Sequence, residues 1–569
     1  MSYDSVRMNE QIRILDHSID HFIDRYNFIT MKADMLGEHP ARQTLFLFPG
    51  GIASKLKRAT RAWRAAGPTS QIFNYERAWG TEDELLGGVA RDLKMRSTAS
   101  GYRDKENRII IADGVINLFG ASPYLFFTAW CSSMQLDWFI FPWDWRRSVD
   151  EIGTFFIDRF LPHFQERVQD ECNNADPLAD YSLIGHSAGG LVVNWILRNV
   201  PPLPGVLRRV ITVAAPFYGY GGQLHRWFEG DPWVNEGDLY TQDIIKTISS
   251  FPGSYSWHFL PEGFYNANQV AFQNDPAYPL ASYPSVDLAT NDPADPYYPQ
   301  PPGKRYPTKA QSGFDLAELA KAKMLFDALT SPLSPVQAAK LVNIRGVTTD
   351  TSTPSTTTWQ LVPPITPSPI TDTSIAPGDG TQPGWTTRDI GLANQVPANV
   401  ITVIGGDAAH FLIMDSPQTF AHLAVVLGIP WEGAAMAKRV IAQVSAKTSE
   451  EALDFVRKMQ KAFAKKPRAK KEQGSLRKYL AKFTDAELRA VGWRVLSDLM
   501  QRPPRTIREG DLPPAPNTGP EPYRAPPRTS ESSAGTKTKK RTNPKGGRAA
   551  RRTSAVAKPR STRRRSRRS

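Results

Sequence analysis

The stretch that decides the fold runs from residue 181 to residue 199 and reads YSLIGHSAGGLVVNWILRN. Its first four residues are mostly apolar, as is typical of a buried strand, and residues 188–199 have the apolar spacing of a helix. Between them, GHSAG (185–189) fits the pattern G-x-S-x-G, in which a sharp turn exposes a serine at the edge of a sheet. The flanking glycines remove side chains that would clash in such a turn. We therefore expect Ser187 to be a nucleophile at a strand-to-helix turn.

Apolar runs of the same kind recur on both sides of this stretch. We expect strands at residues 44–48, 138–141, 210–213, 342–347 and 400–405, and helices at 5–27, 149–169 and 417–427. Short apolar strands that alternate with helices predict an α/β fold, with a mostly parallel sheet and helices on both of its faces.

The composition restricts the class of protein further. The chain has 569 residues, of which 40% are hydrophobic, and two cysteines, Cys131 and Cys172. Two cysteines exclude a disulfide scaffold and make a Cys-rich zinc or iron–sulfur site unexpected. We expect no metal and no cofactor. Charges interrupt the N-terminal segment, and no run of 18 or more apolar residues occurs. We therefore expect no signal peptide, no transmembrane segment and a cytoplasmic location, with peripheral membrane association left open.

Changes in composition along the chain predict four regions. We expect an N-terminal helical segment (1–40), a catalytic domain (41–430), a basic helical extension (431–501) and a disordered tail rich in Pro, Lys and Arg (502–569). Within the catalytic domain, residues 217–306 hold 19 aromatic residues interleaved with many prolines. This composition favours an irregular, aromatic-rich cap inserted at about 217–335.

The positive charge of the chain is concentrated at its end. The formal net charge is +14, and 15 Lys and Arg with no acidic residue lie between Thr536 and Ser569, so the remainder is nearly neutral. Three interpretations of this tail stay open: binding to an anionic membrane surface, binding to nucleic acid, and a solvated extension without a partner. The sequence does not indicate an oligomeric state.

A serine nucleophile needs a base, and in this type of sheet the order along the chain is Ser, then Asp or Glu, then His. His410 follows the expected strand at 400–405 in a loop, whereas His422 lies in an apolar helical stretch, so we favour His410. For the acid we favour Asp379, which sits on a tight glycine turn, over its competitors Asp372 and Asp407.

The reaction also needs N–H donors for the oxyanion. The backbone N–H of Ala188 begins the helix after the nucleophile, and the loop that starts with Gly50 and Gly51 after the first strand can supply a second donor.

Taken together, these segments resemble the lecithin:cholesterol acyltransferase-like family of α/β-hydrolases. Seven motifs are similar to those of that family and occur in its order: FPGGIASKL (48–56), FPWDWR (141–146), GHSAGG (185–190), VAAPFYG (213–219), SSFPGSYSWHFLP (249–261), GDGT (378–381) and AAHFL (408–412). The similarity covers roughly residues 40–430. The sequence departs from the family at Gln382, where an apolar residue is usual, and at Trp143, where tyrosine is usual.

The resemblance implies an α/β-hydrolase fold with Ser187 as nucleophile, Asp379 as acid and His410 as base. It implies the backbone N–H groups of Ile52 and Ala188 as the oxyanion hole. As substrate-binding residues we expect Gly51, Trp143, Phe217, Trp257 and Phe259. The implied function is that of a serine esterase, lipase or O-acyltransferase acting on acyl esters, with lipids as the favoured class. The alternatives are a non-catalytic binding module and a non-lipid esterase or peptidase on the same fold.

Overall fold

The computed structural model describes 18 ranges of the chain: 2–36, 42–64, 73–80, 93–98, 101–116, 124–173, 175–199, 205–219, 247, 250–257, 270, 316–348, 354–359, 370–375, 378–379, 381–405, 408–410 and 412–429. The helical extension and the tail expected at 431–501 and 502–569 lie outside them, as does most of the expected cap.

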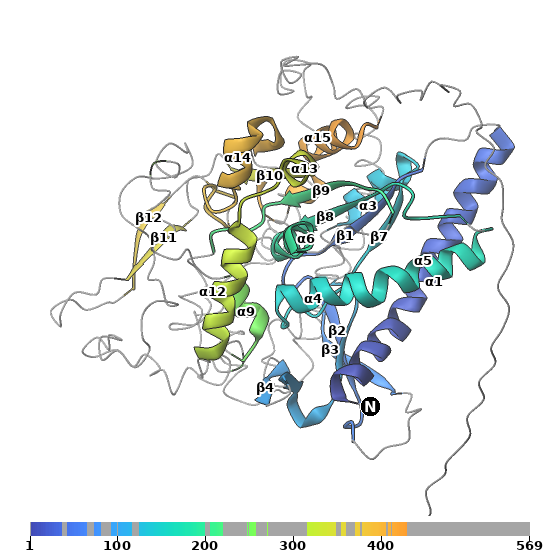
Figure 1. The fold of residues 1–569 in the computed structure, drawn as a ribbon, viewed down its shortest axis with the longest axis horizontal. Coiled ribbons are helices and arrows are strands. Elements are labelled where there is room, and N and C mark those ends of the chain that lie inside the picture. The colour runs from blue at the N-terminus through green and yellow to red at the C-terminus, as the bar shows by residue number, and fades with distance from the viewer. Residues whose placement is uncertain are drawn as a thin grey trace, which may run out of the picture. The chain divides into compact units, whose positions relative to one another are not determined.

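Six parallel strands form the central sheet (Figure 1). Their order across the sheet is β13-β10-β9-β8-β1-β7, and each neighbouring pair is parallel. Their bounds are β1 (Thr44–Phe48), β7 (Asp137–Ile140), β8 (Tyr181–His186), β9 (Leu207–Val213), β10 (Leu341–Val347) and β13 (Val400–Ile404). All six were expected from the sequence, within three residues at each end. The prediction of an α/β fold is confirmed.

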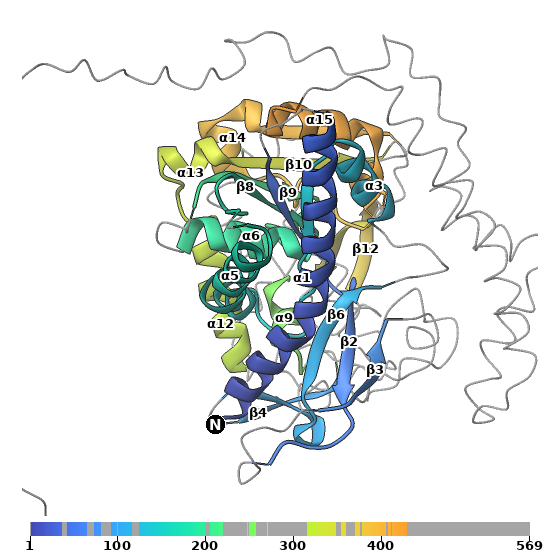
Figure 2. The same ribbon diagram turned by 90° about the vertical axis from the view of Figure 1, so that its right-hand side faces the viewer.

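Helices cover both faces of this sheet because its strands are apolar on both sides. In β1, Phe46 and Phe48 point into one core and Leu45 and Leu47 into the other, and all four are buried. The first core also receives side chains from α1 (Tyr3–Leu36), α4 (Val149–Phe155), α5 (Leu161–Glu171) and α6 (Ala188–Asn199), and the second from α3 (Leu125–Ser133) and α15 (Pro417–Leu427). Figure 2 shows the ribbons of these helices around the sheet. Within the described ranges we find no helix with the length and apolar character needed to span a bilayer.

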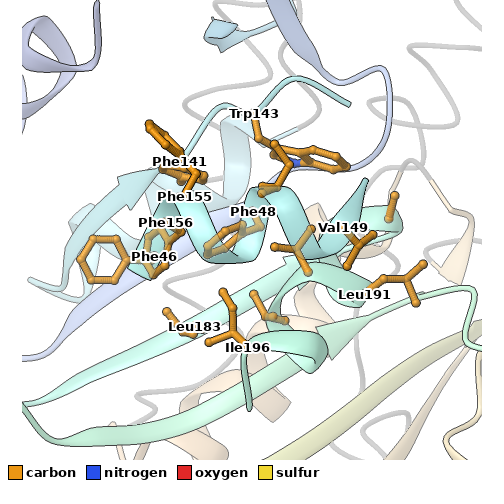
Figure 3. Packing of buried hydrophobic residues seen from close by; sticks show 14 of the residues in the cluster. Phe46, Phe48, Phe141, Trp143, Val149, Phe155, Phe156, Leu183, Leu191 and Ile196 are labelled. Carbon is orange, nitrogen blue, oxygen red and sulfur yellow. The ribbon is translucent and has the colours of Figure 1, made fainter. Parts of the chain in front are cut away.

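The first core is unusually rich in phenylalanine (Figure 3). The ring centroid of Phe46 lies 5.1 Å from that of Phe164 and 5.6 Å from that of Phe156, in edge-to-face geometry. A π-helical turn at Phe156–Phe160 joins α4 to α5, where the N–H of Leu161 donates to the carbonyl of Phe156. Phe156 and Phe160 are both buried, and their ring centroids lie 5.5 Å apart, so this turn brings both rings into the same core.

Several elements were not expected from the sequence. Between β1 and β7 the chain forms an antiparallel sheet in the order β3-β2-β6 and a hairpin β4-β5, with bounds β2 (Ser54–Ala59), β3 (Tyr75–Trp79), β4 (Met95–Thr98), β5 (Gly101–Asp104) and β6 (Ile110–Val115). Later additions are a hairpin β11 (Pro354–Trp359) and β12 (Ile370–Ile375), and helices α9 (Pro252–Ser256), α12 (Leu316–Thr330), α13 (Pro335–Lys340) and α14 (Ile390–Gln395). The strands β2, β3 and β6 are partly exposed and carry charges, which weakens their apolar pattern.

A buried cluster of charges anchors the segment after β7. The guanidinium of Arg146 donates to both carboxylate oxygens of Asp144, at 2.8 and 2.6 Å, and lies 2.8 Å from Asp104 at the end of β5. All three side chains are almost fully buried. Buried charges are retained only when they are paired, so this cluster ties the hairpin β4-β5 to the main sheet.

We expect Phe46→Ala to destabilise the protein by about 3–5 kcal/mol, because it removes a fully buried ring from the centre of the aromatic core. The midpoint and slope of urea denaturation measure the loss. Phe28→Ala is the matched control, since Phe28 on α1 is 61% exposed and its loss should change stability by no more than about 0.5 kcal/mol. Equal effects of the two substitutions would contradict the packing of Phe46 in this core.

Candidate active site

Ser187 lies at the edge of the sheet where the parallel strands end. It follows β8 directly, between β1 and β9, and its backbone has a φ of +52°. Its N–H donates to the carbonyl of Val213 at the end of β9, at 2.8 Å. A positive φ is uncommon for a residue with a side chain and marks a sharp, strained turn. The turn leaves Ser187 partly exposed, whereas its neighbours on both sides are buried.

Two glycines make this turn possible. A Cβ at Gly185 would lie 2.3 Å from the carbonyl oxygen of Gly189, and a Cβ at Gly189 would lie 2.3 Å from the carbonyl oxygen of Phe48. Both distances are far below van der Waals contact, so neither position accepts a side chain without movement of the backbone. The two glycines let α6 start directly against the ends of β8 and β1.

The imidazole of His410 lies between Ser187 and Asp379. Its Nε2 is 2.9 Å from Oγ of Ser187, and its Nδ1 is 2.6 Å from Oδ2 of Asp379. The backbone N–H of His410 also donates to the carbonyl of Asp379, at 2.7 Å. His410 is 4% exposed and follows β13, so the tertiary fold brings together three residues that are up to 223 positions apart.

Asp379 is held in place by its own turn. Its Oδ1 accepts the backbone N–H groups of Thr381 and Gln382, at 2.9 and 2.6 Å, and its own N–H donates to the carbonyl of Gln382. Because Gln382 meets the acid through its backbone, the departure of its side chain from the family pattern leaves this loop intact. Asp379 is 1% exposed, so its free oxygen is directed at His410 rather than at water.

The competing residues occupy other places or fall outside the described ranges. Asp372 lies within β12, where it pairs with Thr357 of β11. Asp407 lies outside the described residues. His422 is half-buried in α15, where burial lowers the pKa of its imidazole.

The loop after β1 lies beside the serine. A Cβ at Gly50 would be 3.1 Å from the Cβ of Ser187, so the two backbones run close together. Ile52 has a φ of +61°, which is rare for a β-branched residue, and its carbonyl accepts the indole N–H of Trp79 at 2.9 Å. Ala188 is the first residue of α6, where an amide has no partner within the helix. These are the two residues from which an oxyanion hole is expected.

The expected substrate-binding residues take different positions. Trp143 is 2% exposed, and its indole N–H donates to the carbonyl of Pro49 at 2.8 Å, so it stabilises the loop after β1 from within the core. Trp257 is half-buried, and its ring occupies the space that a Cβ at Gly51 would take. Phe217 is 3% exposed and lies beyond β9. Phe259 lies outside the described residues.

Two further residues bond to this site and were not expected from the sequence. His186 donates from Nε2 to the carbonyl of His410 at 2.8 Å, and its Nδ1 lies 3.0 Å from the hydroxyl of Tyr124. The same hydroxyl accepts the N–H of Gly50 at 2.7 Å. Burial, with the nearby His410 as a smaller cause, lowers the pKa of His186 to about 3. His186 stands beside Ser187 in the motif, but its place under His410 has no signal in the sequence.

Among the described residues, no three or more His, Cys, Asp or Glu side chains are grouped so that they could hold a metal ion.

Comparisons with known proteins leave the family open. No protein-family model and no curated protein matches the chain. Among solved structures, it is similar to a chain of the crystal structure of the Tle4–Tli4 complex, with 12% identity and a TM-score of 0.40, over 69% of this chain and 100% of that one. It is also similar to the lin2722 gene product of Listeria innocua, with 12% identity and a TM-score of 0.23, over 69% and 96% of the two chains. Likenesses this low carry no assignment of function.

The lowered pKa of His186 predicts how stability depends on pH. In the folded protein His186 stays neutral down to about pH 3, whereas in the unfolded chain it takes a proton below about 6.5. The contribution of the neutral His186 to the free energy of unfolding is fully present above pH 6.5. It is lost as the pH falls toward 3, by up to about 1.4 kcal/mol per pH unit. His186→Gln lacks this uptake of a proton.

The free energy of unfolding should therefore fall more steeply for the wild type than for His186→Gln between pH 6.5 and pH 4. Urea denaturation at several pH values measures both, and the other titrating groups are common to the two proteins. Parallel curves would contradict a neutral, buried His186.

Proposed function

We propose that the chain is a serine hydrolase that cleaves acyl esters through an acyl-enzyme on Ser187. The observation that carries this proposal is the continuous chain of contacts from Oγ of Ser187 through the imidazole of His410 to the carboxylate of Asp379, at 2.9 and 2.6 Å. These are the distances needed for a base to take a proton from a hydroxyl. A module that only binds would have no need for all three groups in contact.

In the first half-reaction, Nε2 of His410 takes the proton of Ser187 as Oγ attacks the ester carbonyl. The imidazolium then gives this proton to the leaving alcohol, and the acyl group remains on Oγ. Asp379 holds Nδ1–H of the ring, which fixes the tautomer and stabilises the transient positive charge. The backbone turn around Asp379 supports this role, because two N–H groups already satisfy its other oxygen.

The negative charge on the attacked oxygen needs donors in fixed positions. We assign them to the backbone N–H groups of Ala188 and Ile52, and one such donor is typically worth about 3–4 kcal/mol in the transition state. The close approach of Gly50 to Ser187 and the left-handed backbone of Ile52 support this assignment. Strained backbone of this kind persists where the surrounding structure holds it, and it gathers at functional sites.

The favoured substrates are esters with an apolar acyl chain. Trp257 presents a half-buried indole beside the loop that carries Gly51, whereas Phe217 is 3% exposed and offers little surface to a substrate. An apolar wall next to the attacked carbonyl favours a hydrocarbon chain, because each buried methylene contributes about 0.8 kcal/mol. The acyl-enzyme is resolved by water, which gives hydrolysis, or by a second alcohol, which gives acyl transfer. Product analysis on a total lipid extract, with and without an acceptor alcohol, distinguishes these two outcomes.

A fluorophosphonate probe should label Ser187, because the activated Oγ displaces fluoride from phosphorus as it would displace an alcohol from an ester. Mass spectrometry of the labelled peptide identifies the residue. Ser187→Ala should abolish both labelling and ester turnover. Ser182→Ala is the matched control, since Ser182 is buried in β8, the strand that leads to Ser187, and its hydroxyl has no partner in the described part of the chain. Labelling at another residue, or none in folded protein, would refute the proposal.

For p-nitrophenyl esters, kcat/KM should rise with acyl length, by about fourfold for each methylene that becomes buried. Trp257→Ala should reduce this gain for long chains and leave the acetyl ester nearly unchanged. Trp138→Ala provides a control, because Trp138 is a half-buried indole on β7 that donates to Ser132. A preference for acetyl esters would favour a non-lipid esterase. An equal loss of kcat/KM for all chain lengths in Trp257→Ala would mean that Trp257 stabilises the loop and does not contact the acyl chain.

A further inference from the structure

A chain of three buried hydrogen bonds joins the loop after β1 to the loop that carries His410. Its members are the N–H of Gly50, the hydroxyl of Tyr124, the imidazole of His186 and the carbonyl of His410, separated by 2.7, 3.0 and 2.8 Å. Tyr124 is 1% and His186 3% exposed, so water does not compete for these bonds. Tyr124 immediately precedes α3, and His186 is the last residue of β8.

The direction of each bond follows from the groups at its two ends. A carbonyl oxygen only accepts, so Nε2 of His186 carries a proton and donates to His410. In a neutral ring Nδ1 is then the acceptor, and it receives the hydroxyl proton of Tyr124. The oxygen of Tyr124 in turn accepts the N–H of Gly50. Each donor in this series of three hydrogen bonds has one acceptor. In each bond the donor is on the side of the loop after β1 and the acceptor is on the side of His410.

This arrangement requires an uncharged His186. A second ring proton on Nδ1 would face the hydroxyl of Tyr124 and break the sequence of donors and acceptors. Burial lowers the pKa of His186 to about 3, so the ring is neutral at pH values well above 3. His410 and Tyr124 are the titratable groups that contact it in the described residues. His186 therefore cannot replace His410 as the base, although it is adjacent to Ser187 in sequence.

A second contact fixes the same two parts of the structure. Oδ1 of Asp415, five residues beyond His410, accepts the N–H of Phe127 in the first turn of α3 at 2.9 Å. Asp415 is 8% exposed, and α3 has no side-chain cap of its own at Tyr124. The start of α3, which carries Tyr124, is thus tied to the segment that follows His410.

We propose that Tyr124 and His186 are positioning residues that hold the oxyanion loop and the base at one fixed separation. This inference rests on the proposed function, in which the N–H of Ile52 and Nε2 of His410 must meet the same tetrahedral intermediate. We call the three hydrogen bonds from Gly50 to His410 the relay. It begins at Gly50, two residues before Ile52, and ends on the backbone carbonyl of His410. A shift of one end relative to the other would weaken contacts made in the transition state and leave binding of the ground state unchanged.

The test compares Tyr124→Phe, His186→Gln and the double variant with the wild type in ester hydrolysis. Tyr124→Phe removes the central hydroxyl, and His186→Gln keeps an N–H near the position of Nε2 but loses the acceptor for Tyr124. Each should lower kcat by about 10- to 100-fold, the cost of misplacing a reacting group by about 1 Å, with KM within about twofold of the wild type. The kcat of the double variant should stay within about twofold of that of the slower single variant, since a relay acts as a unit.

Tyr181→Phe is the matched control. Tyr181 is fully buried at the opposite end of β8, and its hydroxyl has no partner in the described ranges. Its loss should leave kcat within about twofold of the wild type. Circular dichroism confirms that each variant is folded, and if Tyr124→Phe does not fold, His186→Gln alone decides the result.

The possible failures are distinct. A folded wild type with neither ester turnover nor probe labelling would overturn the proposed function and, with it, the relay. An active wild type whose folded variants keep their kcat would overturn the relay alone. A rise in KM at constant kcat would also overturn it, because the bonds would then serve substrate binding. Multiplied losses in the double variant would show two independent structural effects in place of one coupled chain.

Discussion

The contact between the start of α6 and the end of β1 is the constraint on which the rest of the site depends. Gly189 leaves no room for a side chain against the carbonyl of Phe48, and Gly185 leaves none against Gly189. This close approach forces Ser187 into a left-handed backbone and turns it out of the sheet edge. The same approach sets the first turn of the helix, which begins with the amide of Ala188, beside the loop after β1. One steric requirement therefore places both the hydroxyl and the groups that would stabilise an oxyanion.

The sheet converts this local turn into a site because all six of its strands are parallel. Their carboxyl ends lie on one edge, so the segments that follow β1, β8 and β13 converge there although they are far apart in the chain. The strands are covered on both faces, and the rings of Phe46, Phe156 and Phe164 interlock on one of them. A rigid core of this kind keeps loop positions constant to within the few tenths of an ångström that hydrogen bonds tolerate.

Two histidines whose ring centroids lie 5.0 Å apart have different surroundings. His410 has a carboxylate on one ring nitrogen and a hydroxyl on the other, which is the arrangement that our proposal requires of the base. His186 has a carbonyl and a phenol as partners and no counter-ion in contact among the described residues, so burial keeps it neutral. In our proposals, the same type of side chain is therefore a base in one environment and a positioning residue in the other.

The sequence by itself determined the main sheet, since runs such as TLFLF (44–48) are apolar on almost every residue and fit a strand covered on both faces. It also singled out Ser187, His410 and Asp379, because glycine turns and chain order leave local signals. The strands β2 to β6 escaped prediction, because charged and partly exposed positions interrupt their apolar pattern. Only the tertiary structure decided that Asp379 meets His410 and that Tyr124 and His186 link Gly50 to the backbone of His410. Contacts across 31, 62 and 224 residues depend on how strands pair in space, which no local pattern encodes.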